Sequence, residues 1–272
     1  LFGTGQQALQ LVAPCRDAGE IVLDLARRHT ILDRLDEAAV HRTAPPDHAH
    51  NAVELLVPVP DPAKILCVGL NYRSHIAETG RDPPAHPILF PRYPSSLVAH
   101  DEDLVRPKAS SDFDYEGELA FVIGRGGRHI PEADALSHVA GFACFNDGSI
   151  RDWQRHTSQF LPGKTFWRSG SFGPWLVTPD EVGAIGPLTL TTRLNGQVMQ
   201  QARLDDLLFG VPELIAYIST ILPLEPGDVV ATGTTGGVGL FRKPSIWMKP
   251  GDKVEVEIER VGSLVNGVVD EA

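Results

Sequence analysis

The chain has 272 residues, of which 42% are hydrophobic and 22% charged, and its formal net charge is −11. This composition is ordinary for a globular protein, and the length allows one large domain or two small ones. The negative charge argues against nucleic acid or an anionic membrane surface as a partner, and no apolar run is long enough to span a bilayer. The three widely spaced cysteines indicate reduced thiols, so we expect a cytoplasmic protein.

The first 60 residues differ in character from the rest. Residues 20–38 carry apolar side chains at helical spacing, residues 44–50 form a polar break with prolines, and residues 53–62 read as an extended lead-in. We therefore predict a small N-terminal domain over residues 1–60 and a main domain over residues 61–272.

From Lys64 onward the segments are short, β-prone and separated by Gly and Pro. Pro-Gly-Asp turn signals precede two of these segments, and a clear helix is predicted only at 211–222. The main domain is therefore expected to be built mostly from strands.

A pair of polar side chains follows the first of these strands, in GLNYRSHIAETG (69–80). His75 and Glu78 lie three residues apart, which brings them together on a helical turn. A carboxylate can orient an imidazole and raise its basicity, so the pair could activate a water molecule. Taken alone, the pattern is weak and fits a surface ion pair better.

Three carboxylates form the next candidate site. Glu116 and Glu118 lie two apart in an alternating strand pattern and therefore project to the same face, while Leu119, Phe121 and Ile123 fill the other face. Asp147 follows another apolar strand. Three such oxygens suit a hard divalent cation, whereas a solvated strand end would explain the glutamate pair without any ion.

Two later stretches are also candidates. Lys164 follows Pro-Gly in LPGKTF, and by itself it is most simply a solvated lysine, the default for this residue type. The loop GTTGGVG (233–239) follows a strand and could present N–H and hydroxyl donors to a carboxylate, or simply form a tight turn. It is not a nucleotide P-loop, because no Gly-Lys-Ser/Thr follows.

The ordered series DYEGELAFVIG, GFACFNDGSIRDWQ, PGKTF, GPWLVT and GTTGGVG resembles the fumarylacetoacetate hydrolase family, and most of all its small bacterial acylpyruvate hydrolase-like branch, from Pro62 to Asp270. The resemblance implies an α+β, mostly β fold: a mixed β-sandwich roll preceded by a small N-terminal α/β domain. It also implies a homodimer.

The same resemblance assigns roles to residues. It implies that Glu116, Glu118 and Asp147 hold Mg²⁺ or Mn²⁺, and that His75 and Glu78 form a catalytic dyad in a lid. Lys164 would neutralise negative charge developing on the substrate. The residues expected to line the substrate pocket are Tyr72, Arg92, Gln154 and Thr234, with Thr234 gripping the substrate carboxylate. Arg151 lines the same pocket or holds a local carboxylate.

These roles predict a hydrolase that cleaves a carbon–carbon bond in a small anionic 2,4-dioxo acid, through an enolate held by the metal and Lys164. Decarboxylation of oxaloacetate or isomerisation of a hydroxymuconate-type acid on the same site is the alternative. A non-catalytic binding protein is disfavoured by the intact dyad. Departures from the family pattern at Gly148, Trp167, Arg168, Thr235 and Gly267 leave the pocket shape, and hence the substrate, open.

Overall fold

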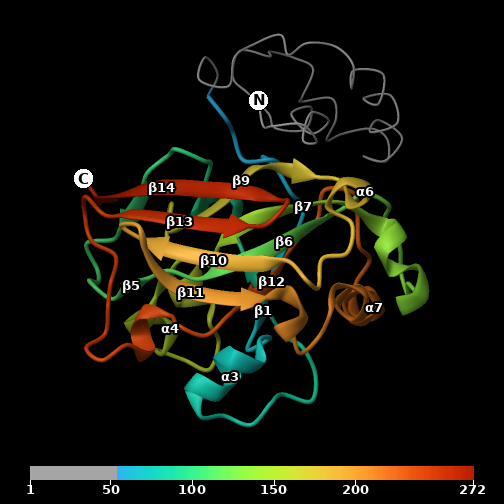
Figure 1. Cartoon of the computed structure of the whole chain (residues 1–272), viewed down its shortest axis with the longest axis horizontal. Coiled ribbons are helices and arrows are strands. Elements are labelled where there is room, and N and C mark those ends of the chain that lie inside the picture. Colours follow the sequence, from blue (N-terminus) through green and yellow to red (C-terminus); the bar gives the residue numbers. More distant parts are fainter. Residues whose placement is uncertain (1–53) are drawn as a thin grey trace.

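A computed structural model describes residues 54–272, and this part of the chain is built mostly from strands with few helices. Two large sheets lie against each other (Figure 1). The prediction of a mostly β fold is therefore confirmed. The helix expected at 20–38 and nearly all of the expected N-terminal domain lie outside the described residues, so that domain boundary stays a prediction.

The larger sheet has seven strands with β12 and β6 near its middle. In spatial order they are β2 (Ile88–Arg92), β1 (Ile65–Gly69), β12 (Val229–Thr234), β6 (Gly117–Ile123), β7 (Val139–Asn146), β9 (Gly170–Val177) and β3 (Leu97–Val98). Strand β12 pairs in parallel with β1 and antiparallel with β6. Segments far apart in the sequence therefore meet at the centre of this sheet.

The second sheet has five strands: β11 (Gln197–Arg203), β10 (Thr189–Leu194), β13 (Lys253–Ile258), β14 (Gly262–Asp270) and β4 (Leu104–Arg106). Asn195 and Gly196, both with positive φ, connect β10 to β11, as a two-residue hairpin turn requires. A short antiparallel pair, β5 (Phe113–Asp114) and β8 (Ser149–Ile150), completes the strands.

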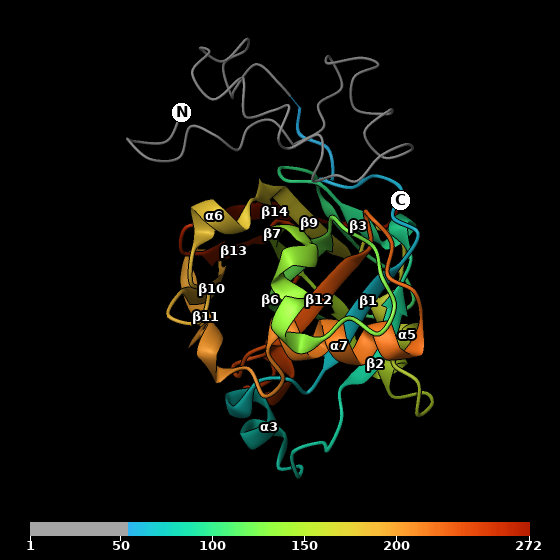
Figure 2. The same cartoon turned by 90° about the vertical axis from the view of Figure 1, so that its right-hand side faces the viewer.

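Short helices connect and cover the sheets. They are α3 (Arg73–Thr79), α4 (Arg151–Gln154), α5 (Leu161–Lys164), α6 (Pro179–Val182) and α7 (Val211–Ile221), with 3₁₀ turns η3 (Pro94–Ser96), η4 (Glu132–His138), η5 (Leu204–Asp206) and η6 (Gly239–Phe241). Helix α7 confirms the helix predicted at 211–222 and lies across the large sheet (Figure 2). Within the part of the chain described, no helix is both long and apolar enough to cross a membrane.

Strand β6 is buried on both faces along its whole length. Leu119, Phe121 and Ile123 pack in the core shared with α7 and the second sheet, as the alternation predicted. Ala120 and Val122 pack in another core on the opposite face. The polar residues at the start of β6 therefore lie at the edge of two apolar layers, where an unpaired charge would be costly.

Candidate metal and catalytic site

The pairing of β6 with β7 brings the three candidate carboxylates together. Gly117 at the start of β6 lies opposite Asn146 at the end of β7, and the Asp147 N–H donates to the Glu116 carbonyl at 2.8 Å. One ligand oxygen from each of Glu116, Glu118 and Asp147 lies within 4.8 Å of the others, and all three residues are buried. The solvated strand end considered from the sequence does not describe this arrangement.

A buried lysine lies between two of these carboxylates. Lys164 is the last residue of the short helix α5, and its Nζ lies 2.6 Å from Glu116 Oε2 and 2.7 Å from Asp147 Oδ2. Burial lowers the pKa of Lys164, but Asp147 and Glu116 raise it by more, so the side chain stays charged. The solvated-lysine interpretation is therefore wrong.

Two buried arginines add positive charge to this cluster. Arg151 Nε lies 2.8 Å from Asp114 Oδ2, and its Nη2 lies 2.6 Å from Glu116 Oε1. Burial raises the pKa of Glu116, but Arg151 and Lys164 outweigh it and lower that pKa to about 2. Arg92 forms an ion pair with Asp147 and also donates to the hydroxyls of Ser96 and Ser169.

Glu118 is the ligand whose charge is least compensated. Its Oε2 accepts the Gly233 N–H at 2.8 Å, and among the described residues its Oε1 has no hydrogen-bond or ion-pair partner. Burial raises the pKa of Glu118 well above its ordinary value, and the charges of Asp147 and Glu116 add to the effect. A cation among the three carboxylates would relieve this repulsion. The all-oxygen donor set fits Mg²⁺ or Mn²⁺.

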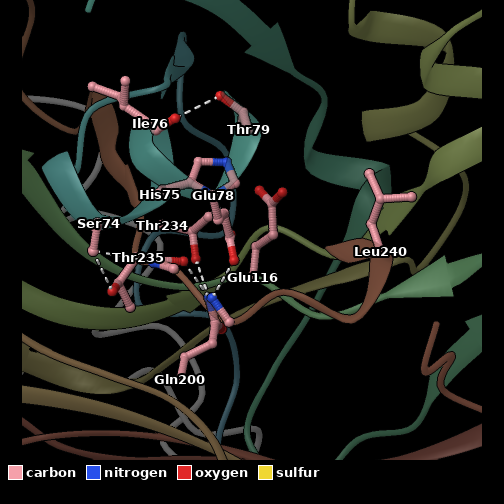
Figure 3. Close-up of polar contacts among 12 residues, drawn as sticks. Ser74, His75, Ile76, Glu78, Thr79, Glu116, Gln200, Thr234, Thr235 and Leu240 are labelled. Atoms are coloured by element: carbon pink, nitrogen blue, oxygen red, sulfur yellow. Dashed lines mark hydrogen bonds and ion pairs between the residues drawn. The ribbon is translucent and has the colours of Figure 1, made fainter. Parts of the chain in front are cut away.

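The histidine and glutamate predicted as a dyad do form one on α3. His75 Nδ1 lies 2.7 Å from Glu78 Oε1, and Glu78 Oε2 accepts the Gly237 N–H at 2.8 Å. The imidazole packs edge-on against Phe241 and is 8% exposed, so this is no surface ion pair. Because Glu78 occupies Nδ1, the other ring nitrogen, Nε2, is left for chemistry. Figure 3 shows the dyad close to the Glu116 carboxylate, and the charge of His75 contributes to the low pKa of Glu116.

The hydroxyl of Thr234, at the end of β12, forms hydrogen bonds with two other protein groups. Its Oγ1 donates to the Gly117 carbonyl at 2.9 Å and accepts the Gln200 Nε2–H at 2.7 Å (Figure 3). In this conformation the hydroxyl proton is not available to a substrate carboxylate. The role predicted for Thr234 stays a prediction that requires these bonds to rearrange.

The other residues predicted to line the pocket are also buried or paired. Tyr72 belongs to the core beside α7, and its hydroxyl has no partner among the described residues. The side-chain oxygen of Gln154 accepts from Arg151 at 2.9 Å. Arg92 holds Asp147, so its direct effect in this structure is on a candidate metal ligand. The predicted contacts of these residues with substrate stay untested.

Sequence reasoning missed three side chains that support the site. Asp114 pairs with Arg151 and accepts the N–H groups of Gly239 and Leu240 at 2.8 and 2.9 Å, while Asn146 Oδ1 accepts the Glu116 N–H at 3.0 Å. Gln200 is the third. Asp114 could have been found, since it continues the alternation of Glu116 and Glu118 by one step. Gln200 had no local signal.

One departure from the family pattern has a steric cause. A Cβ at Gly148 would lie 1.9 Å from the Ser169 carbonyl oxygen, so a valine has no room there without a backbone shift. By contrast, Trp167 is exposed, and the Arg168 guanidinium lies over its ring. The close approach of the Ser169 carbonyl therefore explains the glycine at position 148.

The chain is similar in sequence and in fold to known proteins of one family. The family model described as fumarylacetoacetate (FAA) hydrolase C-terminal matches residues 64–269. The human protein named oxaloacetate tautomerase FAHD2A, mitochondrial, is 44% identical over 219 residues, which cover 80% of this chain and 70% of the human one. A solved fumarylacetoacetate hydrolase from Exiguobacterium antarcticum superposes with a TM-score of 0.76 at 37% identity, covering 84% of this chain and 82% of that one. A 5-carboxymethyl-2-hydroxymuconate delta-isomerase from Mycobacterium smegmatis gives 0.73 at 33% identity, with 82% and 83% covered.

Proposed function

The chain belongs to the fumarylacetoacetate hydrolase family, and from that premise we propose that it is a divalent-metal-dependent enzyme that interconverts the keto and enol forms of oxaloacetate or a similar 2-oxo dicarboxylic acid. The observation that carries the proposal is the His75–Glu78 pair, which leaves one imidazole nitrogen for chemistry and lies close to Glu116, one of three clustered buried carboxylates. The identity to relatives named oxaloacetate tautomerases supports the choice of substrate.

The metal centre supplies the electrophile in this proposal. Glu116, Glu118 and Asp147 would hold Mg²⁺ or Mn²⁺, and the bound ion would polarise the 2-oxo group of a chelating acid. This polarisation acidifies the carbon next to the ketone, which is where tautomerisation moves a proton.

The dyad performs the proton transfer. In the keto-to-enol direction, His75 Nε2 removes a proton from the carbon between the 2-oxo group and the distal carboxylate, Glu78 stabilises the imidazolium through Nδ1, and the enolate oxygen takes a proton from solvent. The reverse direction returns the carbon-bound proton from His75 and releases the oxygen-bound one to solvent. The Lys164 ammonium faces the negative charge that develops on the substrate oxygen. No step requires a covalent bond to the protein.

The charge balance of the site favours an anionic ligand. Four buried carboxylates (Asp114, Glu116, Glu118 and Asp147) face three buried cations (Arg92, Arg151 and Lys164). With Mg²⁺ or Mn²⁺ bound and all four carboxylates ionised, the cluster would carry a net positive charge. A dicarboxylate would neutralise that excess inside a region of low dielectric constant.

Hydrolysis of an acylpyruvate is the second candidate, and the same dyad favours it. A water molecule that gives its proton to His75 could attack the carbonyl farther from the carboxylate, and Lys164 would stabilise the enolate that leaves. Isomerisation of a hydroxymuconate-type acid uses the same proton transfers at another carbon. The three reactions share a site and differ in the bond that changes.

One set of assays distinguishes these functions. We expect the protein with Mg²⁺ or Mn²⁺ to accelerate the decay of enol-oxaloacetate, followed by its ultraviolet absorption, beyond the rate with the metal alone. EDTA should abolish this effect. Release of CO₂ from oxaloacetate, release of pyruvate from acetylpyruvate and isomerisation of a hydroxymuconate are measured in parallel with the same protein. Faster acetylpyruvate cleavage without any tautomerase activity would replace the first proposal with the second.

The assembly and location predicted from the sequence are part of the proposal. We expect a homodimer, which multi-angle light scattering would test, and a cytoplasmic protein, which tagging in the source cell would test. A monomer in solution would contradict the first expectation.

A further inference from the structure

Gln200 is a buried glutamine on β11, in the five-stranded sheet that carries none of the candidate ligands or dyad residues. It is 1% exposed, and both ends of its amide are bonded. Its Oε1 accepts the Gly117 N–H at 3.0 Å, and its Nε2 donates to Thr234 Oγ1 at 2.7 Å and to the Thr235 carbonyl at 2.9 Å. Figure 3 shows the side chain reaching both threonines.

The first of these partners lies between two candidate metal ligands. Gly117 separates Glu116 from Glu118, and a Cβ there would lie 2.0 Å from Thr192 Oγ1 on β10. The second sheet therefore packs directly on the backbone of this glycine. The amide of Gln200 adds a directional bond to that contact, so it fixes the backbone from which both glutamates project.

The other two partners, Thr234 and Thr235, lie in residues 233–237, the part of the GTTGGVG loop that we call the glycine loop. This loop gives one backbone N–H to each half of the site: the Gly233 N–H binds Glu118 and the Gly237 N–H binds Glu78. The conformation of these five consecutive residues therefore sets the position of the dyad relative to the metal carboxylates. Gln200 holds the middle of that stretch.

We propose that Gln200 is a positioning residue: it holds the glycine loop and so fixes the position of the dyad relative to the metal centre. It does not touch the substrate. Its loss would leave the buried Gly117 N–H and the Thr235 carbonyl without their partner and would free the loop to shift. A displacement of about 1 Å in a catalytic group can cost about 10²-fold in rate. The inference rests on the proposed metal site and dyad, and not on which 2-oxo acid is the substrate.

The test compares Gln200→Leu with Gln200→Glu and with a matched control on the same strand. Gln201 is exposed, and its Nε2 donates only to Thr191 Oγ1 at 3.3 Å, so Gln201→Leu removes a neighbouring glutamine amide that lies outside the site. Three quantities are measured for each variant: kcat with saturating Mn²⁺, the Kd for Mn²⁺, and amide hydrogen exchange read peptide by peptide. The Gln200→Glu variant keeps the shape of the side chain should Gln200→Leu fold poorly.

We expect both Gln200 variants to lower kcat about 10- to 100-fold while the Kd for Mn²⁺ changes less than kcat does. Exchange should rise selectively in residues 233–237 and in α3, and Gln201→Leu should match the wild type. Unchanged exchange in both segments would overturn the proposal. So would a uniform rise over the whole protein, because that indicates a general stability role. If the wild type turns over no 2-oxo acid, the proposed function fails, and the exchange result alone still decides the role of Gln200.

Discussion

Replacing Lys164 with Met removes a buried charge while keeping most of the length of the side chain, and three consequences follow from its contacts. In the metal-free protein the ammonium lies 2.6 and 2.7 Å from oxygens of Glu116 and Asp147. Removing one partner of a buried ion pair costs about 3–5 kcal/mol, because the remaining charges lose their compensation. We expect the free energy of unfolding in EDTA, from urea titration, to fall by about this amount.

The same change should have opposite effects on the metal and on the substrate analogue. The carboxylates freed from Lys164 should bind Mn²⁺ at least about tenfold more tightly, about 1.4 kcal/mol, measured by isothermal titration. Oxalate, which chelates as a 2-oxo acid does, should bind the Mn²⁺-loaded variant more weakly, since the ammonium proposed to face it is gone. Loss of a purely structural lysine would not raise the affinity for Mn²⁺ while lowering the affinity for oxalate.

Lys64 provides the matched control. Its Nζ also contacts two carboxylates, Glu225 at 2.6 Å and Asp228 at 3.0 Å, but its side chain is partly exposed and belongs to no part of the site. Lys64→Met also takes a cation away from a buried carboxylate, Asp228, so it controls for the general effect of such a loss, and it should leave both affinities unchanged. An unaltered stability of metal-free Lys164→Met, or weaker Mn²⁺ binding by it, would refute the reasoning.

Three further predictions concern neighbouring groups. His75→Ala should lower kcat by about 10²–10⁴-fold while Mn²⁺ and oxalate still bind. The control is His86→Ala, which removes a ring stacked on Tyr217. If His75→Ala lost Mn²⁺ binding together with activity, His75 would be a metal ligand instead. Because the pKa of Glu118 is raised, the folded metal-free protein holds a proton that the unfolded chain loses at lower pH, so its stability should fall as pH rises from the ordinary glutamate range toward the raised pKa. Mn²⁺ should bind more weakly as pH falls through that window and should release a proton, seen by titration calorimetry in buffers of different ionisation enthalpy; Glu118→Gln that still releases the proton would contradict this. Gly148→Ala should lower the free energy of unfolding by several times the cost of Gly210→Ala, where a Cβ meets only Pro212 Cδ at 3.8 Å, and equal costs would show that the Ser169 contact relaxes freely.

Much of this site could be predicted because its residues lie in short local patterns. The alternation at Glu116 and Glu118 and the three-residue spacing of His75 and Glu78 each correspond to one strand or one helical turn. Asp147 was predictable as the polar residue that follows the next apolar strand, and the family resemblance then connected these patterns. The strands that these patterns belong to, and the helix at 211–222, were predictable for the same reason.

The supporting contacts could not be predicted, because they join residues far apart in the chain. Gln200 and Gly117 are separated by 83 positions, and their bond depends on how the two sheets pack. Arg92 lies 55 positions from Asp147 and was expected to meet substrate, yet its guanidinium is enclosed by protein groups. Burial of a charged side chain is decided by its partners in space, which no local pattern in the sequence reports.

The late position of β12 in the chain has a consequence for how the protein is made. A ribosome completes β1 and β6 long before it reaches β12, the strand that pairs with both. During that interval the nascent chain has two apolar strands with unpaired backbone edges, which makes it prone to aggregation and a substrate for chaperones. Glu118 also lacks the Gly233 N–H until then. Chains that terminate before residue 229 should therefore keep both strand edges unpaired and aggregate more readily than the full chain.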